Sequence, residues 1–138
     1  MTARPARRLR NQVRQRANGR CEYCLMHEDD SYVRHQLDHI TAVRHGGETI
    51  LENLALACLL GNRYKGSDVA ALDPSTGDVV RLFDPRQQPW HDHFTLQGAL
   101  IIPLTPTGRV TASLLRFNAP EHAIERRELL KAGRYRPA

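Results

Sequence analysis

Residues 35–65 read HQLDHITAVRHGGETILENLALACLLGNRYK, and this stretch determines the fold that we expect. His35–Val43 has the composition of a strand, and the glycines that follow His45 indicate a loop. The apolar run Ile50–Ala57 is ambiguous between a strand and a helix, and we place a strand there. A helix then starts near Cys58. The order strand, loop, strand, helix is therefore the predicted centre of the molecule.

A further helix is predicted before this stretch, over residues 5–17. Pro5 suits a helix start. Apolar residues recur at every fourth position, at Leu9, Val13 and Ala17. Asn18-Gly19 ends the helix, because both residues tolerate the left-handed backbone conformation. A tight turn at Cys21–Cys24 then leads into the central stretch.

The second half of the chain is predicted to be rich in β-structure. The central helix extends through Ser67–Ala71, and a strand follows at Val79–Phe83. Leu100–Leu104 and Val110–Phe117 flank the turn residues Thr105–Gly108, and we expect them to pair as a hairpin.

A last helix is expected from Asn118 to about Ala132. Asn118 is a suitable N-cap, Glu121 is its capping-box partner, and Gly133 is the stop signal. The length fits one domain. We predict a single α+β domain over residues 1–138, with a core at about 20–70, a β-rich extension at about 71–117 and a C-terminal helix at about 118–133.

Positive charge is concentrated near the N-terminus. The formal net charge is +5, and residues 1–20 contain seven arginines but no acidic residue. Arginine binds phosphate oxygens through paired hydrogen bonds, so this segment suits a nucleic-acid backbone, although an ordinary solvated surface also fits the charge. We find no apolar run of transmembrane length and no secretory signal, so we expect a cytoplasmic protein without a membrane partner.

Short motifs follow one another along the chain, and their order is more specific than any one of them. They are Cys21-x-x-Cys24, Asp38-His39, Gly46-Gly47, Asn53-Leu54, Cys58 and Asn62-x-x-Lys65. This set resembles the HNH endonuclease family, and in particular its bacterial stand-alone type, over roughly residues 8–70. The resemblance implies a ββα-metal core, preceded by the N-terminal helix and followed by β-hairpins and the C-terminal helix.

Leu37–Ile40 is the predicted centre of the active site. Hydrolysis of a phosphodiester needs an activated water and a Lewis acid on the phosphate. His39 is the predicted general base, because a neutral imidazole accepts a proton near working pH. Asp38 supplies a hard oxygen ligand for Mg²⁺ or Mn²⁺. Adjacent strand residues point to opposite faces, so we expect the strand to distort or end here.

The resemblance also assigns the other site residues. Asn62 stands where the family has its last His or Asn, which implies a second oxygen ligand for the ion. Asn53 corresponds to the middle Asn, which implies that it bonds backbone across the loop and orients the base. Few protein ligands leave positions for phosphate and water, as Mg²⁺ prefers. Arg63 and Lys65 either add charge near the phosphate or lie on a solvated helix face.

The three cysteines raise the question of a structural zinc ion. An odd count with a Cys-x-x-Cys pair argues against a disulfide framework. Many HNH proteins hold Zn²⁺ between two such pairs. Cys21 and Cys24 form the first pair, but Gly61 stands where the second pair, begun by Cys58, needs its other cysteine. Either the three thiols bind zinc with His27 or water as a fourth ligand, or the site is empty and apolar packing replaces it. We favour the empty site.

The leading functional hypothesis is a metal-dependent DNA endonuclease that acts as a monomer or homodimer. Arg8 and Arg14, on the N-terminal helix, are expected to contact phosphates. The alternative is a catalytically inactive nucleic-acid-binding module derived from an HNH nuclease, which the incomplete cysteine motif suggests. The presence of Asp38, His39 and both site asparagines favours the enzyme.

Overall fold

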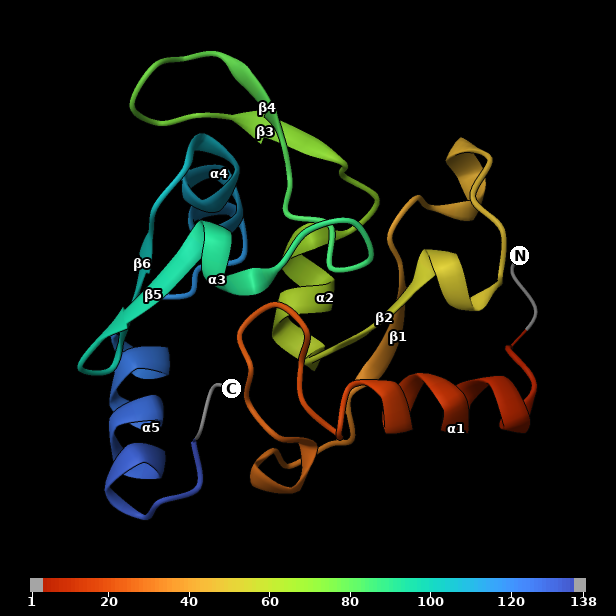
Figure 1. The fold of residues 1–138 in the computed structure, drawn as a ribbon, viewed down its shortest axis with the longest axis horizontal. Helices are drawn as coiled ribbons and strands as arrows, with labels where there is room; N and C mark the ends of the chain where they lie inside the picture. Colours follow the sequence, from red (N-terminus) through yellow and green to blue (C-terminus); the bar gives the residue numbers. More distant parts are fainter. Residues whose placement is uncertain (1–3, 136–138) are drawn as a thin grey trace.

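The computed structural model describes residues 4–135, in which α-helices accompany three two-stranded antiparallel sheets (Figure 1). The α+β class is therefore as predicted. Among residues 4–135, no helix has the length and apolar character that crossing a bilayer requires.

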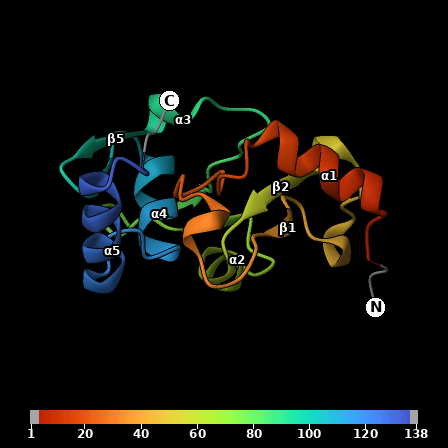
Figure 2. The same cartoon turned by 90° about the horizontal axis from the view of Figure 1, so that it is seen from below.

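The central unit is a hairpin between two helices. β1 (Gln36–His39) pairs with β2 (Leu54–Ala57), and α2 (Leu59–Lys65) follows directly. α1 (Arg7–Arg16) lies on one side of the hairpin and α2 on the other (Figure 2). The predicted order of helix, strand, loop, strand and helix is confirmed.

Both faces of β2 are covered, which fixes the hairpin between its helices. Leu54 and Leu56 pack with Val13 on the α1 side. Ala55 and Ala57 join the larger core on the opposite side. Burial on two sides explains why this strand is continuously apolar instead of alternating.

The helix α1 ends as the sequence predicts. Asn18 and Gly19 have φ angles of 53° and 72°, in the left-handed region that stops a helix. Arg16 then ties the helix to the sheet, because its guanidinium donates to the carbonyl oxygens of Leu51 at 2.8 Å and Leu54 at 2.5 Å. Part of the N-terminal positive charge is therefore structural.

Short 3₁₀ turns replace the outer ends of both predicted strands. β1 ends at His39, and the chain continues through η2 (Val43–His45) to Gly46, whose φ is 93°. η3 (Leu51–Asn53) occupies the first part of the predicted strand Ile50–Ala57, which begins only at β2. Another such turn, η1 (Glu28–Asp30), lies in the loop between α1 and β1.

The predicted extension of the central helix through Ser67–Ala71 is wrong. Gly66, with a φ of 54°, directly follows α2 and turns the chain away. β3 (Ala70–Leu72) instead pairs with β4 (Val79–Arg81), so the strand predicted at Val79–Phe83 is confirmed in its first part.

The hairpin predicted for the second half has a different partner. β6 (Leu100–Pro103) pairs with β5 (Phe94–Gln97), which follows the short helix α3 (Trp90–His93). The expected partner, Val110–Phe117, is not a strand, because most of it belongs to the helix α4 (Pro106–Leu114).

A capping signal explains the helix α4. The hydroxyl of Thr105 accepts a hydrogen bond from the Gly108 amide at 3.0 Å, and Pro106 occupies the first helical position. Val110 and Thr111 are both buried. Their β-branched side chains favour a strand by intrinsic preference, and tertiary packing outweighs that preference here.

The last helix, α5 (Pro120–Lys131), is confirmed, but its predicted cap is wrong. Ala119 is the N-cap and makes no side-chain bond. Asn118 instead accepts from the amide of Ile101 at 2.9 Å and donates to its carbonyl at 2.8 Å, which joins the start of α5 to β6. Gly133, with a φ of 71°, follows the helix as predicted.

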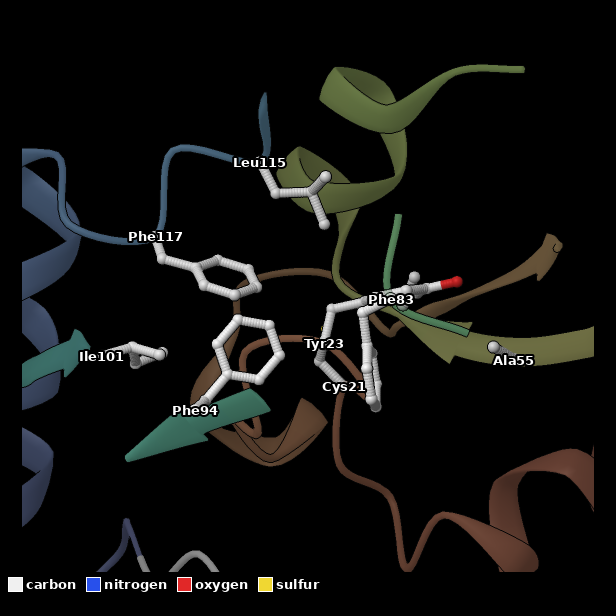
Figure 3. Packing of buried hydrophobic residues seen from close by; sticks show 9 residues of the cluster. Cys21, Tyr23, Ala55, Phe83, Phe94, Ile101, Leu115 and Phe117 are labelled. Atoms are coloured by element: carbon white, nitrogen blue, oxygen red, sulfur yellow. The ribbon is translucent and has the colours of Figure 1, made fainter. Parts of the chain in front are cut away.

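An aromatic cluster joins the central unit to the second half of the chain. Tyr23 and Ala55 come from the central unit, and they pack in one buried cluster with Phe83, Phe94 and Phe117 (Figure 3). The rings of Phe83 and Phe94 lie 5.5 Å apart, edge to face. The central unit therefore shares its main core with the later elements.

Candidate active site

The register of the first hairpin places Asp38 and His39 on opposite faces of β1. Asp38 is paired with Ala55, and His39, the last residue of the strand, is paired with Leu54. The strand ends at the point that the adjacent pair was expected to disturb. Both residues nevertheless border one pocket of about 330 Å³, because the chain turns there; Asn62 lines the same pocket.

Asp38 is buried and held by two side chains. The phenol of Tyr23 donates to its Oδ2 at 2.7 Å, and the Lys65 ammonium lies 3.3 Å from each carboxylate oxygen. Burial raises the pKa of Asp38 above its usual range, although the charge of Lys65 and the Tyr23 bond oppose this shift. The carboxylate is thus fixed in orientation and paired with a cation.

Lys65 lies inside the protein, with only 3% of its surface exposed. Its ammonium also donates to the carbonyl of Ile40 at 3.3 Å. Lys65 therefore does not lie on a solvated helix face, and its contribution of charge near the phosphate stays a prediction. Burial of Lys65 was not expected, because lysine is almost never buried without a partner and the partner comes from another element.

His39 is positioned by the loop that follows η2. Its Nε2 lies 2.9 Å from the hydroxyl of Thr49. The same loop is closed by Asn53, whose amide accepts from the Thr41 amide at 2.9 Å and donates to the carbonyls of Thr41 at 2.9 Å and Glu48 at 2.8 Å. Asn53 therefore holds the segment that carries Thr49.

The loop also depends on Gly47. A Cβ atom at this position would lie 1.8 Å from the carbonyl oxygen of Thr41 and 2.8 Å from the side-chain nitrogen of Asn53. Only glycine allows the two chain segments to approach so closely. In the Gly46-Gly47 motif, the second glycine is therefore the one that the close approach of the two segments requires.

Asn62 faces the pocket from α2. Its Nδ2 donates to the side-chain oxygen of Gln36 at 2.8 Å, which leaves Oδ1 as the atom for a ligand. Gln36 was missed by the sequence analysis, although the two-residue strand period places it on the same face as Asp38. Thr49 and Tyr23 were missed as well; nothing in their local sequence signals a contact with the site.

The donor atoms at this pocket fit a hard divalent cation. One carboxylate and one amide oxygen are ligands that Mg²⁺ and Mn²⁺ prefer. The Asp38 oxygens accept two hydrogen bonds, one from Tyr23 and one from Lys65, and a carboxylate has about four acceptor positions, so capacity for a cation remains. The residues present therefore fit the ion that the family implies.

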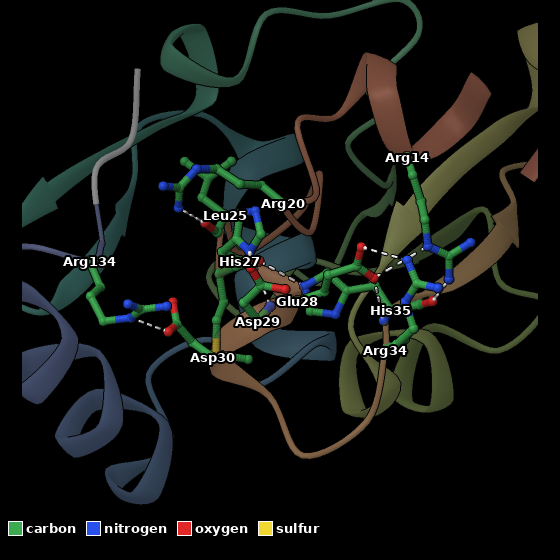
Figure 4. A network of polar contacts seen from close by, with 11 residues as sticks. Arg14, Arg20, Leu25, His27, Glu28, Asp29, Asp30, Arg34, His35 and Arg134 are labelled. Carbon is green, nitrogen blue, oxygen red and sulfur yellow. Dashed lines mark hydrogen bonds and ion pairs between the residues drawn. The ribbon is translucent and has the colours of Figure 1, made fainter. Parts of the chain in front are cut away.

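The predicted arginine contacts occupy different environments. Arg8 is exposed on α1, and Arg63 is exposed on α2. Arg14 is already engaged: its guanidinium donates to the carbonyl of His35 at 2.7 Å and lies 3.4 Å from Glu28 (Figure 4). Arg14 therefore anchors α1 to the loop before β1.

The three cysteines converge beside the main core. The sulfur atoms of Cys21, Cys24 and Cys58 all lie within 4.8 Å of one another. The amide of Cys24 donates to the Cys21 sulfur at 3.4 Å, and the amide of Gly61 donates to the Cys58 sulfur at 3.3 Å. Backbone geometry is thus the same in both pairs, although the second lacks its last thiol.

The fourth position of this cluster has no protein ligand among residues 4–135. His27, one of the two fourth ligands considered, is not part of the cluster, and its Nδ1 accepts from the Asp29 amide at 3.0 Å. Burial alone would raise the pKa of Cys21, but hydrogen bonds from Cys24 and Cys58 outweigh it and lower that pKa. Three thiols fit three corners of a tetrahedral zinc site, and water is the fourth ligand that remains.

An apolar cavity adjoins the cysteine cluster. It has a volume of about 270 Å³ and is bordered by all three cysteines and by residues of α5. Leu59 and Leu60 line it, and Leu60 is exposed. The phenol of Tyr135 closes one side by donating to the carbonyl of Cys24 at 2.7 Å.

Comparison with known proteins identifies the central unit. Residues 21–68 match the HNH endonuclease family. No curated protein and no solved structure matches the chain. HNH endonucleases act on nucleic acid and require a divalent metal ion. The matched segment contains Asp38, His39, Asn53, Asn62 and all three cysteines.

Proposed function

We propose that the HNH endonuclease domain of residues 21–68 makes this chain a metal-dependent hydrolase of phosphodiester bonds in DNA. The observation that carries the proposal is the convergence of Asp38, His39 and Asn62 on one pocket. Asp38 and Asn62 would hold Mg²⁺ or Mn²⁺ through oxygen atoms. When bound, the ion polarises the phosphate and stabilises the negative charge that develops during hydrolysis.

His39 is the proposed general base. Because the Thr49 hydroxyl bonds its Nε2, Nδ1 is the nitrogen that takes the proton from the attacking water. Thr49 fixes the ring, and Asn53 fixes the loop that carries Thr49. The protein therefore orients the base before any substrate binds.

Tyr23 and Lys65 are the proposed positioning residues for Asp38. The ammonium of Lys65 favours the ionised carboxylate and offsets part of the penalty of burying it. The Tyr23 phenol stays protonated, because burial and the neighbouring Asp38 charge raise its pKa well above its usual range. Tyr23 is thus a permanent hydrogen-bond donor to the carboxylate.

Cleavage of supercoiled plasmid in Mg²⁺, Mn²⁺ or EDTA tests the proposal. We expect cleavage with a divalent ion, and a loss of about 10²- to 10⁴-fold in rate for His39→Ala, the usual contribution of a general base. Binding of DNA by His39→Ala should remain at the wild-type level. His122→Ala is the matched control, because His122 lies on α5, outside the HNH segment.

The same assay separates the enzyme from an inactive binding module. DNA binding without cleavage in any divalent ion, or equal rates for the wild type and His39→Ala, would overturn the nuclease proposal. Nicked or linear product also reports whether one strand or both are cut, which bears on whether a monomer or a homodimer acts.

A further inference from the structure

A basic groove runs along α1 and ends beside the candidate active site. It has a volume of about 820 Å³ and lies between one face of α1 and the loop that enters β1. Its cationic walls come from both segments and comprise Arg4, Arg7, Arg10, Arg14 and Arg34. Arg7, Arg10 and Arg14 recur at helical spacing, so they share one face of α1.

The positive charge of this groove is only partly neutralised. Glu28 lies 3.4 Å from Arg14 and 3.5 Å from Arg34 (Figure 4). Among residues 4–135, no ion pair joins Arg4, Arg7 or Arg10 to a carboxylate. The Arg10 guanidinium donates to the carbonyl oxygen of Pro5 at 2.5 Å, but among the described residues no carboxylate neutralises the charge of these three arginines.

Local electrostatics at this end of α1 are unfavourable without an anion. The first turn holds arginines and no acidic residue, and the N-cap makes no side-chain bond. Positive side chains there oppose the positive end of the helix dipole. Partial burial and the charges of Arg4, Arg14 and Arg7 lower the pKa of Arg10. A bound polyanion relieves both the mutual repulsion and the repulsion from the dipole.

The groove continues into the pocket that holds Asp38. Leu37 lines both hollows. Gln36 lines the groove and accepts the hydrogen bond from Asn62, which lines the pocket. A strand whose phosphate lies at His39 therefore has a direct path along α1.

We infer that this groove binds the phosphodiester backbone of the nucleic-acid strand that is cut, on one side of the scissile phosphate. The inference rests on the proposed function for its link to catalysis. α1 has ten residues and is about 15 Å long, which spans roughly four phosphates of one B-form strand. Arg8, which does not line the groove, is not part of this binding surface.

Binding measurements in a catalytically silent background test the groove by itself. A fluorescent duplex is titrated with His39→Ala protein without divalent metal, over a series of salt concentrations. Adding Arg7→Ala and Arg10→Ala should weaken binding about tenfold or more and lower the salt-dependence slope by about two. Arg8→Ala should have a smaller effect, and Arg127→Ala, on α5, is the remote control.

Cleavage then tests the link to the active site. In an otherwise wild-type chain, Arg7→Ala with Arg10→Ala should raise KM for long DNA about tenfold and leave kcat at saturating DNA unchanged. For a very short oligonucleotide, the same variants should have little effect on kcat/KM. Far-ultraviolet circular dichroism checks that α1 remains folded, and Arg7→Glu with Arg10→Glu supplies a stronger perturbation of charge.

The outcomes separate this inference from the proposed function. If the wild type cleaves DNA but Arg7→Ala with Arg10→Ala matches Arg127→Ala in affinity and salt slope, the groove inference fails and the nuclease stands. If no cleavage occurs but the groove variants lose affinity as expected, the groove stands as a binding surface and the nuclease proposal fails. A loss of kcat with unchanged KM would also overturn the groove inference.

Discussion

The Asp38 pocket and the cysteine cluster are built from neighbouring parts of one domain, but they differ in how completely they are supported. In the pocket, each proposed functional side chain is held by another: Asp38 by Tyr23 and Lys65, His39 by Thr49, and Asn62 by Gln36. In the cluster, three thiols lie close together, but Gly61 has no side chain to serve as the fourth ligand.

The difference indicates which region maintains the active-site geometry. The pocket is fixed by hydrogen bonds and an ion pair within residues 21–68, and the aromatic core supports it from behind. Tyr23 belongs to that core and also donates to Asp38. We therefore expect the candidate active site to tolerate loss of metal at the cysteines but not loss of its own polar partners.

Removal of the buried cation should have the largest effect. Lys65→Met leaves the Asp38 carboxylate buried without its ion pair, so we expect a loss of about 3–5 kcal/mol in the free energy of unfolding at neutral pH. The pKa of Asp38 is already raised by burial and rises further without Lys65. The penalty should therefore shrink as pH falls and Asp38 becomes protonated. Urea unfolding at several pH values measures it, and a pH-independent loss would contradict the ion-pair explanation.

Loss of the Asn53 hydrogen bonds that close the loop should have the next-largest effect. Asn53→Ala removes three hydrogen bonds to backbone, worth about 1 kcal/mol each, and leaves those backbone groups to find water. We expect a loss of roughly 2–3 kcal/mol and slower cleavage, with His39 still present. Asn62→Ala is the contrasting variant: it should reduce activity and metal affinity with little loss of stability, because Asn62 is only half-buried and makes a single solvent-exposed side-chain hydrogen bond. Equal destabilisation by both variants would contradict a structural role for Asn53 that Asn62 does not share.

Loss of the hydrogen bond between Thr49 and His39 should slow catalysis and leave the free energy of unfolding nearly unchanged. Thr49→Val keeps the shape of the side chain but removes the hydroxyl that bonds His39. We expect a fall of about tenfold in kcat, the kinetic equivalent of one ordinary hydrogen bond. Thr49→Ser, which retains the hydroxyl, should restore most of the rate. A rate for Thr49→Val that matches the wild type would show that the hydroxyl does not orient the base.

The smallest effects are expected at the cysteines. Purified protein should contain well below one zinc per chain, and Cys58→Ala should lower the free energy of unfolding by only about 1 kcal/mol, as for loss of a small apolar group. A structural zinc would instead contribute on the order of 10 kcal/mol. Gly61→Cys adds the fourth thiol and should raise the zinc content. One equivalent of zinc in the wild type, with a large loss in the free energy of unfolding for Cys58→Ala, would show that the cysteine cluster is a complete metal site.

Local patterns in the sequence predicted the central unit because its side chains act locally. The strand period of two is enough to separate Asp38 from His39, and the Asn18-Gly19 pair is enough to end α1. Thr105 carried an equally local capping signal for α4. Thr105–Gly108 also has the composition of a hairpin turn, and that interpretation predicts a strand at Val110–Phe117.

Contacts between distant segments account for what the sequence did not predict. Lys65 is close to Asp38 only because α2 packs on β1, and Arg14 is occupied only because Glu28 and His35 come from the loop after its helix. The arginine count near the N-terminus therefore overstated the charge available to a ligand. Of those arginines, Arg7 and Arg10 line the groove and Arg8 does not, and a contact of Arg8 with phosphate stays a prediction.

The aromatic cluster sets a limit on how the chain can be divided. The family match ends at residue 68, whereas Phe83, Phe94 and Phe117 cover the buried faces of Tyr23 and Ala55. A fragment cut at the end of the match would expose this apolar surface to water and lose the packing behind the phenol that orients Asp38. The unit that folds together is therefore longer than the segment of residues 21–68 that contains the candidate active site. Any transplant of residues 21–68 into another protein has to carry the later hairpins with it.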